Sequence, residues 1–173
     1  MRKIYIVLTY TGTILSRIVK MYTRREFSHV SIAFDEDLKE MYSFGRLNPY
    51  NPFIGGFVHE GIDKGTFKRF KKTKTRIYSL SVAEEDFDRM VEVINDIRED
   101  RLHYKFNVLG LIGVAIHFKF KREKCFYCAE FVKYVLEQSK AEYNLPELIK
   151  PEDFKEINGL DVVYSGILKE YNS

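Results

Sequence analysis

Cys128 could carry out nucleophilic chemistry, because it begins a segment with helical periodicity. The range Cys128–Ser139 places its apolar side chains on one face, namely Phe131, Val132, Val135 and Leu136, so we predict a helix whose first turn holds the cysteine. Unpaired backbone N–H groups and the helix dipole favour a thiolate at that position. The Cys128 amide could also form half of an oxyanion hole, with Tyr10 as a candidate second donor. The alternative is a buried cysteine that packs as a small apolar residue.

His29 is the candidate general base for this thiol. The segment FSHVSIAF alternates, which predicts a strand with His29, Ser31 and Ala33 on one face and the apolar residues on the other. The small Ser31 and Ala33 leave room for a helix terminus to approach His29, as proton transfer from a thiol requires. A packed, hydrogen-bonded strand histidine is the alternative.

A third side chain is needed to orient the imidazole. If the acidic run Asp35–Asp37 forms a three-residue turn into a second strand around Glu40–Phe44, His29 pairs with Ser43 on the same face. Ser43 is therefore the predicted orienting residue. Glu40 is the chemically stronger alternative, but this register places it on the opposite face.

The remaining elements form a frame of strands and helices. We predict strands at Ile4–Thr9, Arg76–Leu80 and Asp161–Lys169, a helix from Ile14 capped by Thr13, a helix after a Ser81/Glu84 capping box, a long irregular loop at Asn48–Phe57, and an apolar segment, Phe106–Phe118, capped by Asn107. This order predicts an α+β fold with mostly antiparallel strands covered by helices.

The chain of 173 residues fits a single domain over residues 1–173 with one core. Its two cysteines, Cys125 and Cys128, are too close to cross-link distant parts of the chain, so we expect a reducing, cytoplasmic location. The N-terminal apolar run is short for an export signal. No stretch reaches the roughly 18 apolar residues of a membrane span.

The positive charge is concentrated in Lys68–Arg76, which holds six cations in nine residues. We interpret it as a solvated loop and strand edge. Binding to nucleic acid, phosphate or an anionic membrane surface is the alternative function of this segment.

Other chemistry fits the sequence less well. In the redox CxxC arrangement the first cysteine begins the helix, whereas here Cys128, the second, does so. A single CxxC supplies only two zinc ligands, and the zinc deaminase pattern fails because Glu60 follows His59 directly. We therefore expect no metal or other cofactor. His59, His103 and His117 are interpreted as structural or solvated residues.

The order of these motifs resembles a known family. A strand and helix come first, followed by SHVSIAFD, EMYSFGR and, much later, CAEFVKYVL at a helix start. From about Ile4 to Ala141 this resembles the permuted papain-like hydrolases of the NlpC-type superfamily, in which the histidine precedes the cysteine. The family motif Cys-Ser-Glu-Phe-Val matches Cys128–Val132, and its His-Val-x-Ile strand matches His29–Ile32. The third position departs, since the family often has Glu, His or another polar group and this chain offers Ser43.

The resemblance implies a circularly permuted papain-like fold, an antiparallel sheet or partial barrel packed against helices, with the nucleophile at a helix N-terminus. It also implies hydrolysis of a small peptide-like, acyl-amide, ester or thioester substrate through an acyl-Cys128 intermediate, with His29 as base and then acid. Relatives act on cell-wall peptides or lipid-linked acyl groups, and the lack of an export signal argues against direct cell-wall work. The alternative is a binding module for polyanions or lipids that keeps a papain-like shell without turnover.

Overall fold

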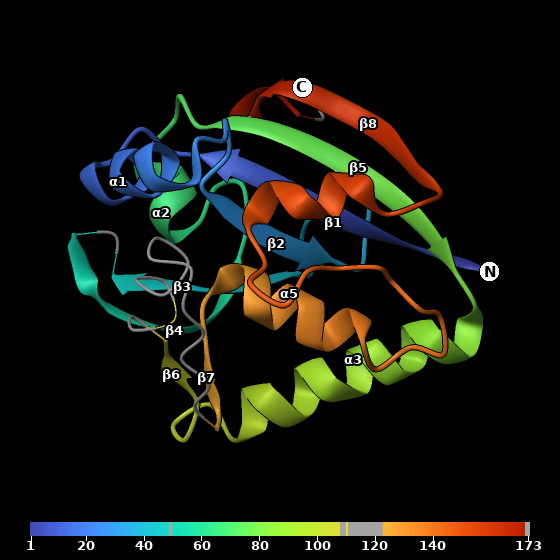
Figure 1. Cartoon of the computed structure of the whole chain (residues 1–173). Helices are drawn as coiled ribbons and strands as arrows, with labels where there is room; N and C mark the ends of the chain where they lie inside the picture. The colour runs from blue at the N-terminus through green and yellow to red at the C-terminus, as the bar shows by residue number, and fades with distance from the viewer. Residues whose placement is uncertain (49, 108–109, 111–122, 172–173) are drawn as a thin grey trace.

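A six-stranded antiparallel sheet forms the frame of the protein (Figure 1). The computed structural model describes residues 1–48, 50–107, 110 and 123–171. The strand order is β4-β3-β2-β1-β5-β8, and the bounds are β1 Arg2–Tyr10, β2 His29–Ala33, β3 Met41–Asn48, β4 Asn51–Glu60, β5 Lys74–Val82 and β8 Leu160–Ile167. The prediction of an α+β fold with an antiparallel sheet packed against helices is confirmed.

Helices α3 (Glu84–Glu99) and α5 (Cys128–Leu136) cover one face of this sheet, together with a 3-10 helix at Pro151–Glu156. α5 contacts β2 and β3, whereas α3 contacts β1 and α5. The main core lies between these layers and includes Ile4, Ile6, Val30, Ile32, Phe44, Phe131, Val132 and Phe154. The apolar face predicted for α5 is therefore the face that packs on the sheet.

A smaller core covers the opposite face of the sheet. It includes Val7, Ala33, Met41, Ile77, Leu168 and Phe67, the last of which comes from the short helix α2 (Gly65–Arg69). α1 (Ile14–Thr23) follows β1 at the end of the sheet where β2 begins. Its predicted cap is confirmed, because the Thr13 hydroxyl oxygen accepts a hydrogen bond from the Ser16 N–H.

Two sequence-based predictions about this frame are wrong. Most of the predicted loop Asn48–Phe57 belongs to β4, which pairs with β3 through Gly45–Gly56 and Arg46–Gly55. β4 is one of the two edge strands of the sheet, the strands in which proline is usually found. Ser81 does not cap a helix. It lies in β5, which pairs with β1 as far as Val82, and Ala83 is the N-cap of α3.

A small parallel pair, β6 (Lys105–Phe106) and β7 (Cys125–Phe126), leads directly into α5. The Asn107 side-chain oxygen accepts a hydrogen bond from the Gly110 N–H. Most of the apolar segment Phe106–Phe118, and His117 within it, lie outside the described residues. Among the helices that are described, none has the length and apolar character to cross a membrane.

Candidate active site

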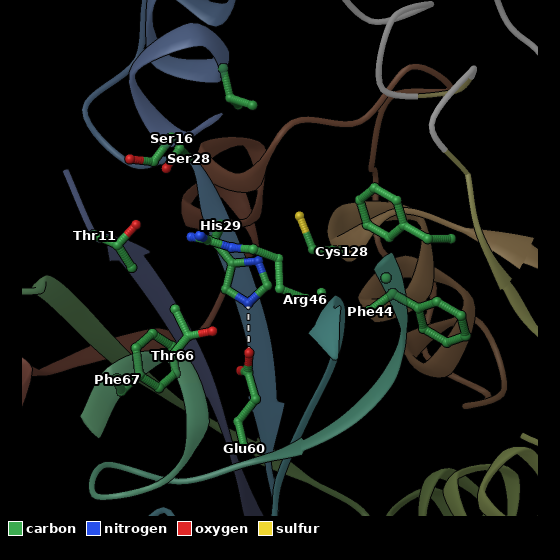
Figure 2. A pocket seen from close by; sticks show the side chains of 14 residues that line it. Thr11, Ser16, Ser28, His29, Phe44, Arg46, Glu60, Thr66, Phe67 and Cys128 are labelled. Carbon is green, nitrogen blue, oxygen red and sulfur yellow. Dashed lines mark hydrogen bonds and ion pairs between the residues drawn. The ribbon is translucent and has the colours of Figure 1, made fainter. Parts of the chain in front are cut away.

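Cys128, His29 and Glu60 line one pocket at the end of the sheet beside α1 (Figure 2). Each comes from a different element: His29 is the first residue of β2, Glu60 the last of β4, and Cys128 the first of α5. The structure therefore brings together the cysteine and histidine that the sequence analysis selected, although they are far apart along the chain.

The approach of α5 to His29 differs from the sequence-based expectation. α5 packs against the face of β2 that presents Val30 and Ile32, whereas His29 and Ser31 alternate onto the other face. The hydrogen-bonded pairing of β2 with β3 extends only over Ile32–Tyr42 and Ala33–Met41. From Ser31 back to His29, β2 has no ladder pairing with β3. The start of α5 reaches the His29 imidazole through this unpaired part of the sheet.

The first turn of α5 is held in place by Glu130. Its carboxylate accepts a hydrogen bond from the Tyr127 N–H at 3.2 Å and another from the Asn107 amide at 3.0 Å. A carboxylate near a helix N-terminus is favoured by the helix dipole. Deeper in the core, the Tyr127 hydroxyl donates to the carbonyl of Ile149. These contacts fix the backbone from which the Cys128 thiol enters the pocket.

Glu60 is the residue that binds the imidazole of His29. Nε2 of His29 lies 3.0 Å from Oε1 of Glu60, and the Ser31 hydroxyl donates to the other carboxylate oxygen. The Cys128 thiol approaches from another side of the ring in Figure 2. This arrangement leaves Nδ1 as the nitrogen available to the thiol.

Ser43 and Glu40 do not orient His29. Continuing the observed register brings His29 level with Gly45, so the predicted pairing with Ser43 is wrong by two residues. A shift of two preserves the face, and the buried Ser43 hydroxyl lies close enough to the Glu60 carboxylate to lower its pKa. The Ser43 hydroxyl forms no hydrogen bond of normal geometry with any described residue. The Glu40 carboxylate accepts a hydrogen bond from Tyr42 outside this pocket.

The charges of His29 and Glu60 stabilise each other. Burial alone lowers the pKa of His29, but the Glu60 charge and the side-chain interactions with Cys128 and Glu60 outweigh it and raise that pKa to about 10. Burial tends to raise the pKa of Glu60, yet the charge of His29 and the nearby Ser31 and Ser43 hydroxyls leave it lowered. At neutral pH the pair is therefore an imidazolium and a carboxylate.

The rest of the pocket wall is divided between polar and apolar side chains. Arg46 and the hydroxyl groups of Thr11, Ser16, Ser28 and Thr66 form the polar part. The apolar part is formed by Val19, Phe44, Phe67 and Phe106. Tyr10, the candidate second oxyanion donor, does not line the pocket, and the Lys20 ammonium lies over its ring at 4.7 Å.

The other candidate residues lie apart from this site. Cys125 is buried in β7 as a free thiol and does not line the pocket. His59 stacks on Tyr42 and contacts the Lys39 carbonyl, and the exposed His103 pairs with Asp100. The described residues contain no group of three or more His, Cys, Asp or Glu side chains placed to hold a metal ion.

Glu60 is the site residue that the sequence analysis missed. It follows His59, three residues after the end of the predicted loop Asn48–Phe57, in a stretch to which no strand was assigned. Had IGGFVHE been recognised as a strand, its alternation would have placed Gly56, Val58 and Glu60 on one face. A carboxylate that shares a face with a glycine and a valine is a candidate for a buried, paired charge.

Comparison with known proteins adds no family assignment. A scan of the chain against protein-family models matched none of them, and a search of the curated proteins found no match. What the site does is therefore inferred from the contacts and charges of its own residues.

Proposed function

We propose that this chain is a cysteine-dependent acyl hydrolase of the permuted papain-like type, acting on an amide, ester or thioester. The observation that carries the proposal is the single pocket that contains the Cys128 thiol, the His29 imidazole and the Glu60 carboxylate, with Cys128 at a helix start. A nucleophile, a proton carrier and an orienting group are the three parts that such catalysis needs.

In the resting enzyme His29 holds the proton of the Cys128 thiol. An imidazolium beside the sulfur stabilises a thiolate, and the unpaired N–H groups in the first turn of α5 favour the same negative charge. Glu60 acts as a positioning residue. It fixes the ring orientation through Nε2 and stabilises the imidazolium, which keeps Nδ1 directed to the thiol.

The thiolate attacks the substrate carbonyl and forms a carbon–sulfur bond, while the carbonyl π electrons move to oxygen. The N–H of Cys128 is the donor suited to stabilise that oxyanion. Collapse of the intermediate breaks the bond to the amine, alcohol or thiol leaving group, which takes the proton from His29. Neutral His29 then removes a proton from water, whose oxygen displaces Cys128 from the acyl group, and the thiolate–imidazolium pair is restored.

The carboxylate at the third position supports this proposal more strongly than the serine expected from the sequence. A hydroxyl can accept a hydrogen bond from imidazole, but it cannot balance the charge of an imidazolium. With Glu60 in that place, the site has the charge balance that the chemistry requires. The proposed membership of the NlpC-type superfamily rests on the Cys128–Val132 and His29–Ile32 motifs and on their order along the chain.

Trapping of the acyl-enzyme tests the function. The purified protein is mixed with p-nitrophenyl acetate and with an acetyl thioester, quenched in acid, and analysed by peptide mass spectrometry. We expect an acetyl adduct on Cys128 and steady release of product. Cys128→Ala removes both, whereas Cys125→Ser, the matched control in the same CxxC, retains both. A folded protein that gives neither adduct nor turnover would contradict the proposal and favour a binding module.

A further inference from the structure

Arg46 places a guanidinium in the wall of the same pocket. It follows Gly45 on β3, lies among the lining residues with Cys128 and His29, and is about half-buried. In Figure 2 its side chain extends away from β3 into the region between His29 and the start of α1. Its Nη2 donates a hydrogen bond to the Thr13 hydroxyl oxygen at 3.1 Å.

The guanidinium is held in this orientation by contacts that carry no negative charge. Thr13 is the N-cap of α1, so its hydroxyl oxygen is itself fixed by the Ser16 N–H. On another side the Phe70 ring lies 5.7 Å from the guanidinium carbon. Neutral groups therefore hold the guanidinium of Arg46, which lines the pocket.

Among the described residues of the pocket, no carboxylate is paired with Arg46. Within the part of the chain that the structure describes, no carboxylate oxygen forms an ion pair with it. Glu60 is the acidic residue that lines the pocket, and its two oxygens bind His29 and Ser31. Burial and the charge of Arg69 both lower the pKa of Arg46, as expected for a cation without a counter-charge.

We propose that Arg46 binds an oxyanion of the substrate, a carboxylate or a phosphate, so that the hydrolase acts on acyl compounds with a negative charge near the reacting carbonyl. This inference rests on the proposed function of Cys128. A guanidinium has five N–H donors in a planar fork, and bidentate binding of an oxyanion uses two of them. The hydroxyls of Ser28 and Thr66 line the same pocket and can complete the contacts.

Two thiol reagents of similar size test this assignment without knowledge of the natural substrate. Iodoacetate carries a carboxylate and iodoacetamide is neutral, and the rate of alkylation of Cys128 by each is measured by peptide mass spectrometry. The rate with iodoacetate is divided by the rate with iodoacetamide, so that general changes in thiol reactivity cancel in this ratio. We expect Arg46→Gln to lower this ratio about tenfold, the size of one hydrogen bond to a charged group. Arg46→Lys retains most of it.

Arg17→Gln is the matched control, because it also neutralises a guanidinium at the start of α1 but at an exposed position outside the pocket. Its ratio should equal that of the unaltered protein. Protection of Cys128 from iodoacetamide by glutarate or by glycerol 3-phosphate, at matched ionic strength, then distinguishes a carboxylate from a phosphate ligand.

The outcomes separate the two proposals. An unchanged ratio in a folded Arg46→Gln protein, with Cys128 still reactive, overturns the role of Arg46 and leaves the proposed function standing. An equal fall in Arg17→Gln also overturns it, because the effect is then one of net charge. If Cys128 reacts with neither reagent, the proposed function fails, and the inference fails with it.

Discussion

His29 and Glu60 contact each other across an intervening strand. Nε2 and Oε1 are 3.0 Å apart, although β3 lies between β2 and β4 in the sheet. Gly45 of β3 lies at this crossing: a Cβ atom there would be 3.4 Å from Cε1 of His29 and 3.7 Å from Oε1 of Glu60. The absence of a side chain at this position leaves the two groups free to meet.

Replacement of Gly45 tests this relationship. A Cβ atom at 3.4 Å is within ordinary van der Waals contact, so Gly45→Ala should keep most of the activity. Gly45→Val adds two methyl groups where the imidazole and carboxylate approach, and we expect kcat/KM for p-nitrophenyl acetate to fall at least about a hundredfold, as expected when a reacting group is displaced by about 1 Å. Equal activity of the two variants in stopped assays, with both folded by circular dichroism, would contradict the role of Gly45.

Loss of the Glu60 charge should change the pH profile of hydrolysis. The pKa of His29 is raised to about 10 chiefly by Glu60, against the effect of burial, so the alkaline limb of kcat/KM should lie near pH 10. In Glu60→Gln the imidazolium loses the negative charge that stabilises it. The pKa of His29 then falls toward its ordinary value of 6.5, and the alkaline limb moves to lower pH with it. Removing an orienting carboxylate should also lower kcat by roughly 10²- to 10⁴-fold.

Glu40→Gln is the control for this variant, because it makes the same chemical change at an acidic residue outside the pocket. Its pH profile should match that of the unaltered protein. Identical alkaline limbs in all three proteins would show that Glu60 does not set the protonation of His29.

The same pair makes folding stability depend on pH. His29 has a folded pKa above its unfolded value of 6.5, so its contribution is complete below pH 6.5 and is lost as the pH rises to about 10. Glu60 has a folded pKa below its unfolded value of 4.5, so its contribution is present above pH 4.5 and is lost as the pH falls through the folded pKa. The pair stabilises the fold most between these values.

Urea unfolding at several pH values measures this effect. One titrating group changes the free energy of unfolding by at most about 1.4 kcal/mol per pH unit. The difference in stability between the unaltered protein and Glu60→Gln should therefore shrink as the pH rises from 6.5 to 10. A difference that stays constant over this range would argue that the two residues are not ionised together.

The two serines near Glu60 should differ in importance. Ser31 donates a hydrogen bond to the carboxylate, whereas the Ser43 hydroxyl makes none within the described residues. Ser31→Ala removes a hydrogen bond to a charged group, worth about 1.5–3 kcal/mol, so kcat/KM should fall about tenfold or more. Ser43→Ala should change it less than about threefold. A larger fall in kcat/KM for Ser43→Ala than for Ser31→Ala in a steady-state assay would restore Ser43 as the orienting residue.

The sequence was sufficient to predict the parts of the site that depend on local pattern. The start of α5 follows from the periodicity after Cys128, and the face of β2 that carries His29 follows from simple alternation. Both signals come from a few consecutive residues that are strongly apolar on one side. The α+β class was predictable for the same reason.

The partner of His29 was not predictable, because it depends on the length of one turn and on a strand that was taken for a loop. Asp35 accepts hydrogen bonds from the Lys39 and Glu40 N–H groups, which lengthens the turn, and Phe34 pairs with Glu40. Leu38 adopts a left-handed φ of 56° within this turn while its side chain is buried. The alternation of apolar residues does not show where such a strained but buried residue will lengthen a turn.

The carboxylate of the site comes from β4, one of the two edge strands of the sheet. Edge strands have one neighbour and are held by fewer backbone hydrogen bonds, so they separate from a sheet more readily than central strands do. When β4 frays at its Glu60 end, Cys128 and His29 lose their counter-charge while the core beneath α5 stays packed. Activity would then be lost at a lower temperature or denaturant concentration than the fold itself. The rate of amide exchange in β4 would rise in parallel with the loss of activity.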